Sequence, residues 1–136
     1  AYGERILNDK KILGFIDKDG IFINKENAED INLSNLTIKV FGWKEKFKKI
    51  LSDIFIAEEN YEFEILKITF SPNGFLTVEE KDLKTIFLGF DPNLIEYQLQ
   101  IINNLKIELK KNNFSKKIDT IDLTDPNKPK IKVFKP

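Results

Sequence analysis

The sequence contains no cysteine, no histidine and no methionine. The lack of cysteine excludes disulfides and thiolate metal sites. The lack of histidine removes the commonest general base and the commonest metal ligand. Because methionine is absent even at position 1, we expect the chain to begin inside a longer protein, as an excised domain or a processed form.

Long apolar runs and an excess of charge of one sign are absent as well. No stretch approaches the roughly eighteen apolar residues of a membrane span, so we expect none in this chain. Lys+Arg and Asp+Glu number 22 each, which gives no overall attraction to nucleic acid or anionic lipid. The hydrophobic content of 41% and the twelve Phe among 136 residues indicate instead a single globular domain, 1–136, with a real core.

The segment from Gly14 to Ile23 predicts a β-hairpin, with Gly20 supplying the positive φ of its turn. A calcium loop at Asp17, Asp19 and Gly20 is the sharper alternative, but the further acidic ligands and the closing Glu of an EF-hand are missing. Around this hairpin we expect an interrupted strand at Tyr2 to Phe15, a polar loop at Asn24 to Ser34 and a strand at Leu36 to Phe41.

Two segments carry apolar residues at three- and four-residue spacing, which predicts amphipathic helices. The first runs from Trp43 to Ile54, and its lysines fall mainly on the other faces. A basic helix of this kind suits a membrane surface or a partner, whereas the plainer alternative is a solvated face on a core-packed helix. The second helix is expected to begin with Asp91 as N-cap, with Pro92 at its first position, and to end at Asn112-Asn113.

The remaining segments alternate between apolar and polar residues, as strands do. Glu62 to Leu88 predicts a three-stranded antiparallel meander, with a turn at Ser71–Gly74 and a bulge near Leu66-Lys67. Ile118 to Pro136 predicts a final hairpin. The expected fold is therefore α+β: an antiparallel, mostly meander sheet of about eight or more short strands with two amphipathic helices packed on it.

The second strand of the final hairpin, Lys130 to Phe134, is the main candidate for a binding site. A terminal strand often lies at a sheet edge, where unpaired N–H and C=O groups can pair with another chain. Ile131 and Val133 point to one side of this strand, with the lysines beside them. The hypothesis is a docking strand, limited by the prolines at 129 and 136. The alternative is an inward strand of the core, since Ile and Val suit either position.

Catalytic chemistry is not visible in the sequence. It has no Walker-type loop, no glycine-rich dinucleotide turn and no interleaving of aromatics and lysines of an RNA-binding kind. Its carboxylate clusters are Glu58-Glu59, Glu79-Glu80 and Asp122/Asp125, of which the first two are expected in solvated turns. We therefore expect an interaction module rather than an enzyme, with no catalytic residue, cofactor, metal or nucleic-acid partner.

Several segments, in order, resemble the extracytoplasmic C-terminal β domain of the FtsQ/DivIB family of bacterial cell-division proteins. Nearly the whole chain takes part, although each motif alone is weak. The segments are Ala1-Tyr2 (the end of an "xP-h-A" strand), Phe15–Phe22 ("h-I-D-x-x-G-h-h"), Phe41-Gly42-Trp43 before the first helix, Phe75–Val78 with Ile86–Gly89 ("h-x-h … h-x-L-G"), Asp91 before the second helix and Ile121–Thr124 ("I-D-L-R").

The resemblance implies a non-catalytic scaffold of the divisome that acts in septum formation. Such proteins are anchored in the inner membrane by one helix, followed by a small POTRA domain and then this β domain on the periplasmic side. We expect the membrane helix and the POTRA domain to lie upstream of Ala1. The family's partners are other divisome membrane proteins, notably FtsB and FtsL, and a terminal strand is a main contact. The corresponding partner-binding residues here are Thr124, Lys130, Ile131, Lys132, Val133 and Phe134.

Two positions depart from the family pattern. Thr124 stands where the family has Arg, and Asp125 stands where an aromatic often follows. We therefore expect a different partner or a different side-chain grip, although backbone pairing would survive. The alternative function is an extracytoplasmic ligand-binding module for peptidoglycan or lipid. A dry, deep pocket of roughly 300 Å³ or more under the helices would favour that alternative, and a filled core with a bare sheet edge would favour the scaffold.

Overall fold

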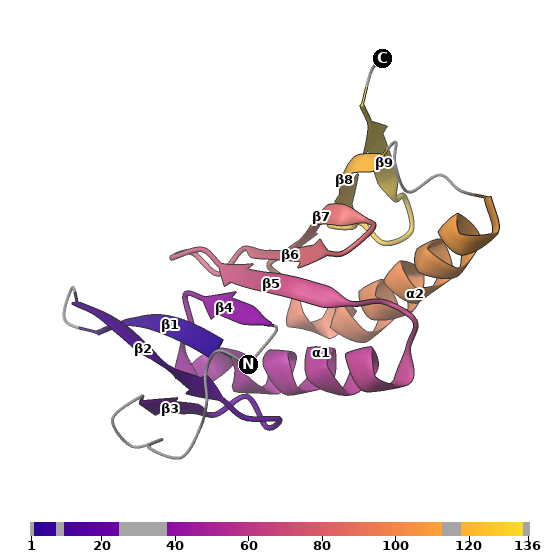
Figure 1. The fold of residues 1–136 in the computed structure, drawn as a ribbon. Coiled ribbons are helices and arrows are strands. Elements are labelled where there is room, and N and C mark those ends of the chain that lie inside the picture. Colours follow the sequence, from indigo (N-terminus) through magenta and orange to yellow (C-terminus); the bar gives the residue numbers. More distant parts are fainter. Residues whose placement is uncertain (1, 8–9, 25–37, 113–117, 135–136) are drawn as a thin grey trace.

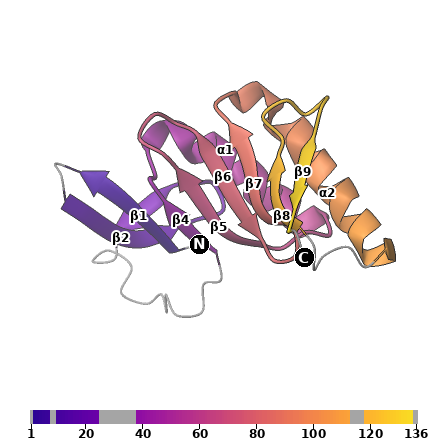
Figure 2. The ribbon, with the colours of Figure 1, turned by 90° about the horizontal axis from the view of Figure 1, so that it is seen from above.

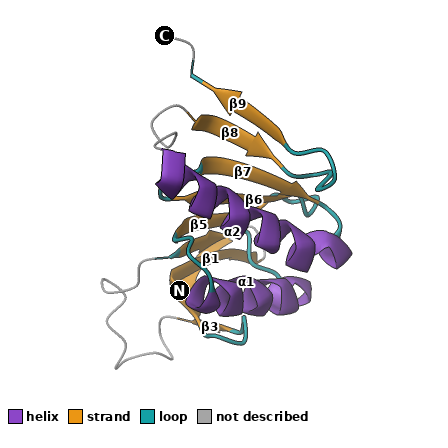
Figure 3. Cartoon of the chain, turned by 90° about the vertical axis from the view of Figure 1, so that its right-hand side faces the viewer, coloured by secondary structure: helices purple, strands orange, loops and turns teal. Residues whose placement is uncertain are grey.

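Over the described residues, the protein is a nine-stranded sheet with two helices packed on it, as the computed structural model shows (Figures 1 and 3). The structure describes residues 2–7, 10–24, 38–112 and 118–134. Each helix begins with a 3-10 turn, η3 (Glu45–Phe47) before α1 (Lys48–Asn60) and η4 (Pro92–Leu94) before α2 (Ile95–Asn112). The strands are β1 (Tyr2–Leu7), β2 (Lys10–Ile16), β3 (Phe22–Asn24), β4 (Lys39–Phe41), β5 (Ile65–Phe70), β6 (Leu76–Glu80), β7 (Lys84–Gly89), β8 (Ile118–Asp122) and β9 (Lys130–Val133).

The strand order is β3-β2-β1-β4-β5-β6-β7-β8-β9, which leaves β3 and β9 at the two edges. Figure 2 shows β9 beside β8 at one end of the sheet. The α+β class is confirmed, but the sheet is mixed, since β1·β4, β4·β5 and β7·β8 pair in parallel and the other neighbours are antiparallel. The reason is connectivity. A helix joins β4 to β5 and β7 to β8, and such a crossover returns the chain to a parallel neighbour.

Most local predictions are confirmed. β2 and β3 form the expected hairpin, with Phe15 opposite Ile23, and β5, β6 and β7 form the expected meander. The pairing of β5 with β6 shifts register between Ile65 and Lys67, next to the predicted bulge. Asp91 caps the second helical segment by accepting a hydrogen bond from the backbone N–H of Asn93 at 2.9 Å. The loop predicted at Asn24 to Ser34, beyond Asn24 itself, and the start of the strand predicted at Leu36 to Phe41 lie outside the described residues.

The core lies between the helices and one face of the sheet. Leu51 and Ile54 of α1 and Leu99 and Ile102 of α2 are almost fully buried. The strands contribute a further buried set, which includes Val40, Ile68, Val78, Ile86 and Ile121. The lysines around the start of α1 are exposed, as the solvated-face alternative requires: Lys44, Lys46, Lys48 and Lys49. Apolar periodicity therefore identified the buried face of each helix.

Trp43 connects the first hairpin to the helical layer. Its indole Nε1 donates a buried hydrogen bond to the carbonyl oxygen of Gly20 at 2.8 Å. The Asp17 carboxylate accepts the backbone N–H groups of Asp19 and Ile21, so it closes the turn rather than facing a cation. Gly20 has a φ of 79°, and a Cβ there would collide with the carbonyl oxygen of Lys48 at the start of α1. The turn therefore fits against α1 only because position 20 has no side chain.

We expect Gly20→Ala to lower the free energy of unfolding clearly more than Gly74→Ala, measured by urea denaturation. Both residues have positive φ, at 79° and 91°, so each substitution carries the cost of an L side chain there, about 1–2 kcal/mol. At position 74 the nearest atom to an added Cβ is Phe47 Cζ at 4.0 Å, so only position 20 adds a backbone collision. Equal losses for the two variants would contradict this account of Gly20.

Candidate functional site

The final hairpin has the predicted form. β8 and β9 pair antiparallel, with Ile121 opposite Ile131 and Asp122 opposite Lys130, and a register irregularity lies between Ile118 and Thr120. The turn between them is closed by the backbone N–H of Lys128, which donates to the Asp125 carbonyl oxygen at 3.0 Å. β9 is the last strand in the order, so among the described residues it pairs with β8 alone. The opposite backbone edge of β9 is therefore open to another strand.

The two apolar residues of β9 share the face of the core without being buried by it. Ile131 and Val133 lie opposite the buried Ile121 and Ile118, so they point to the helical side of the sheet. They are nevertheless 47% and 51% exposed, and Phe134 beyond them is 58% exposed. The alternative of an inward core strand required Ile131 and Val133 to be buried, and that expectation is wrong. The helices do not cover the sheet as far as β9. The strip is an exposed apolar edge of the kind that proteins use or protect.

The other predicted residues of this site divide into two groups. Lys130 and Lys132 are exposed and lie opposite Asp122 and Thr120. Thr124 follows β8, and its hydroxyl donates to the Asp122 carboxylate at 2.6 Å. That bond and the bond from the Thr124 N–H lower the pKa of Asp122 below its usual range. The five predicted residues from Lys130 to Phe134 thus lie together along β9 and the position after it. The Thr124 side chain, in contrast, is engaged within its own hairpin.

A cleft of about 520 Å³ lies elsewhere, between the starts of the two helices. Its walls come from η3 and the first half of α1, the end of β5 with its turn to β6, the end of β7, and the start of α2. Its volume passes the roughly 300 Å³ expected of a ligand pocket, but the cleft is open to solvent rather than enclosed. The described residues therefore present both a cleft and a bare sheet edge.

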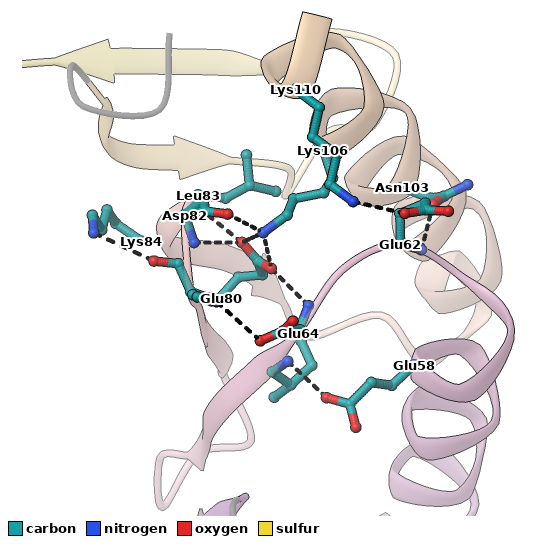
Figure 4. A network of polar contacts seen from close by, with 12 residues as sticks. Glu58, Glu62, Glu64, Glu80, Asp82, Leu83, Lys84, Asn103, Lys106 and Lys110 are labelled. Atoms are coloured by element: carbon teal, nitrogen blue, oxygen red, sulfur yellow. Dashed lines mark hydrogen bonds and ion pairs between the residues drawn. The ribbon is translucent and has the colours of Figure 1, made fainter. Parts of the chain in front are cut away.

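A buried polar network links α2 to the turn between β6 and β7 (Figure 4). Glu80 is 1% exposed, and its two carboxylate oxygens accept backbone N–H groups of Glu64, Asp82 and Leu83 at 2.7–2.9 Å. The Lys106 ammonium donates to both oxygens of Glu80, at 3.0 and 2.7 Å, and to Asp82 at 2.6 Å. All three hydrogens of Lys106 and both oxygens of Glu80 thus have partners, which is how a buried ion pair becomes tolerable.

The burial of Glu80 corrects the expectation of a solvated acidic turn at Glu79-Glu80. Glu80 is the last residue of β6 and follows Leu76 and Val78 on the buried face, so the period of two continues into a charged residue. Lys106 likewise lies four residues after the buried Ile102 on α2. Both positions could have been predicted as buried from the sequence, because each continues an apolar face. The polar residues around Glu80 favoured a solvated turn instead.

The contacts of the Lys106 network stabilise its charged groups. Burial by itself would lower the pKa of Lys106, but its bonds to Asp82 and Glu80 outweigh burial and raise that pKa above its ordinary value. The hydrogen bond from Lys106 lowers the pKa of Asp82. Neither the 520 Å³ cleft nor a smaller one of about 210 Å³ between α1 and α2 is lined by any of these three residues. Neither of these two clefts therefore borders the network.

Glu58 is a second perturbed carboxyl, and its place in α1, half-buried, corrects the expectation of a solvated turn at Glu58-Glu59. Burial raises the pKa of Glu58 above its ordinary value, against the hydrogen bond that its carboxylate accepts from the Ile65 N–H, and the nearby Glu64, Glu59 and Glu80 raise it further. Glu58 lines neither cleft, so this shift carries no catalytic assignment. Within the described ranges, no group of three or more acidic residues is arranged to hold a metal ion, and no helix is long and apolar enough to cross a bilayer.

We expect Lys106→Met to destabilise the domain by about 3 kcal/mol, because it leaves the buried Glu80 carboxylate without its cation. The matched control is Lys110→Met, one turn further along α2, which removes an exposed pair with Glu62 and should leave the unfolding midpoint unchanged. Urea denaturation of both variants measures the difference. Similar midpoints for the two would show that the Lys106–Glu80 pair does not support the fold.

We expect the destabilisation caused by Asp82→Asn to depend on pH. The pKa of Asp82 is depressed in the folded state, so its contribution is complete above its unfolded pKa of about 3.9 and is lost as pH falls through the folded pKa. The gap in stability between wild type and Asp82→Asn should therefore be constant from pH 7 to 5 and close towards the acid limit of folding. Urea curves across this range measure it, and a constant gap down to that limit would contradict the ion pair with Lys106.

Comparison with known proteins leaves the motifs described above as the basis for any family assignment. No protein-family model and no curated protein matches this chain. Over the described residues, the exposed β9 edge and the 520 Å³ cleft are the two candidate sites for function.

Proposed function

We propose that this chain is a non-catalytic scaffold domain of the bacterial divisome, of the FtsQ/DivIB type, and that it binds other division proteins by strand addition at β9. One observation carries the proposal. β9 ends a nine-stranded sheet with an open backbone edge and presents Ile131, Val133 and Phe134 about half exposed. A partner strand would complete the hydrogen bonding of this edge and cover the apolar residues.

The form of β9 limits what such a partner can be. Pairing is confined to Lys130–Val133 and the residue after it, because Pro129 has no N–H to donate. Main-chain bonds would supply affinity, and the exposed aliphatic side chains would select apolar residues at alternate positions of the partner strand. A short extended segment of another membrane-anchored division protein, similar to FtsB or FtsL, meets these requirements.

The side-chain contacts with the partner would differ from the family pattern. The Thr124 hydroxyl is bonded to Asp122 within the hairpin, so it is not available in place of the family's Arg. We infer that recognition rests on the backbone of β9 and on the five residues from Lys130 to Phe134. We also propose that the domain lies on the periplasmic side of the inner membrane, tethered through a segment outside this chain.

The backbone contribution can be tested with proline. N–H groups alternate along an edge strand between its neighbour and solvent, so one of Lys132→Pro and Val133→Pro removes a solvent-facing donor while keeping the bonds to β8. That variant should fold normally and should lose co-purification of division proteins from cells, whereas Val133→Ala, which keeps the N–H and removes only two methyl groups, should reduce it less. Unchanged co-purification with two folded proline variants would refute docking at β9.

The place of docking can be tested by photo-cross-linking in cells. A benzoylphenylalanine at Phe134 should capture a division protein that mass spectrometry identifies. Phe90 is the matched control, because it is also an exposed phenylalanine, 60% against 58%, but belongs to the segment between β7 and η4. Capture of the same protein from both positions, or capture at Phe134 only of proteins unrelated to division, would count against the proposal.

A further inference from the structure

We propose that the 520 Å³ cleft binds a single-chain amphiphile whose headgroup is anionic and carries hydroxyl groups. The site is independent of the docking strand, because none of the residues that line the cleft belongs to β8 or β9. It consequently gives the domain a second binding function, which would hold whether or not β9 docks a division protein.

The position of the cleft follows from the directions of the strands. β4, β5, β7 and β8 all run the same way, since β4·β5 and β7·β8 are parallel pairs and β6 lies antiparallel between β5 and β7. η3 follows β4 and η4 follows β7, so both helical segments begin at the same ends of these strands (Figure 1). Loops and helix N-termini therefore converge at one end of the sheet, on the face that both helices cover, and the cleft lies between them (Figure 3).

The floor of the cleft is apolar and suits an alkyl chain. The rings of Phe47 and Phe70 stack with centroids 4.0 Å apart and an interplanar angle of 5°. Leu76, Leu88 and Ile95 are buried and complete this floor. The volume of about 520 Å³ falls within the range of small-molecule sites, roughly 300–1,000 Å³. A flexible chain can therefore replace water over these side chains.

The mouth of the cleft favours negative charge. Of its two carboxylates, Asp53 pairs with Lys49 at 3.2 Å and Asp91 accepts the Asn93 N–H at 2.9 Å. Lys46 has no carboxylate partner among the described residues, and its ammonium contacts only the Phe47 ring, 5.3 Å from the centroid. The helix start on this side also lacks a side-chain cap at both Lys44 and Phe47. Glu45, the acidic residue of this first turn, is paired with Lys48, so the Lys46 ammonium remains as the charge that an anionic group can meet.

Gln98 supplies the acceptor for a hydroxyl group. This side chain is 1% exposed and lines the cleft, and its amide nitrogen donates to the carbonyl oxygens of Leu88 at 2.7 Å and Leu123 at 2.9 Å. Because both partners are acceptors, the amide orientation is settled, and its oxygen has no donor among the described residues. Solvent reaches this oxygen, so a hydroxyl group of a ligand in the cleft can take the place of water there.

The probe is lauroyl lysophosphatidylglycerol below its critical micelle concentration, titrated calorimetrically into the folded chain. It combines an alkyl chain, a phosphate and free hydroxyls. We expect binding at one molecule per chain, weakened about tenfold in the zwitterionic choline analogue of the same chain length, and absent with glycerol phosphate alone. No binding of the glycerol lipid, or equal affinity for the choline lipid, would overturn the proposal.

Variants locate the site. Lys46→Glu should weaken binding about tenfold, whereas Lys111→Glu, an exposed lysine in the last turn of α2, should leave it unchanged. Ile50→Trp should fill the cleft and abolish binding. Because Lys46 is exposed, Lys46→Glu should fold normally. It therefore tests the location of the lipid even if Ile50→Trp disturbs folding. Binding that is insensitive to Lys46→Glu would place the lipid elsewhere and refute the assignment, independently of any result at β9.

Discussion

Two helical crossovers determine the architecture of this domain. α1 joins β4 to β5 and α2 joins β7 to β8, and each returns the chain to a parallel neighbour. Both helices therefore begin at the same end of the sheet and cover the same face (Figure 3). The apolar face of the central strands is buried beneath them. The outer strands, which are added by hairpins, extend the sheet beyond this cover.

Both candidate sites result from that arrangement. The cleft exists because the two helix starts converge at one end of the sheet, where short turns leave space between them. The exposed strip exists because β9 is added beyond β8, past the point where the helices bury the sheet, so that Ile131 and Val133 continue the core face without being covered. A site for a small ligand and a site for a polypeptide can thus occur on one small domain without sharing residues.

The interior also contains polar groups that hold distant segments together. Lys106 bridges α2 to Glu80 and Asp82, and Gln98 bridges α2 to the ends of β7 and β8 through the carbonyl oxygens of Leu88 and Leu123. Such groups stabilise one register of helix on sheet, because a shift by one residue would leave buried charges and carbonyls without partners. They position α2, and α2 in turn forms one wall of the cleft.

The local elements could be predicted from the amino-acid sequence. The hairpin turn at Gly20, the N-cap at Asp91, the bulge near Lys67 and the buried stripes of both helices depend on residues close together in the chain, and all were predicted. Four features became visible only once the elements were packed together: the parallel pairs, the burial of Glu80 against Lys106, the cleft and the exposure of β9. These features depend on which elements become neighbours in space, as in Lys106 and Glu80, which lie 26 residues apart in the chain. Local propensity does not encode such pairings, because they arise from the burial and hydrogen bonding of the whole sheet.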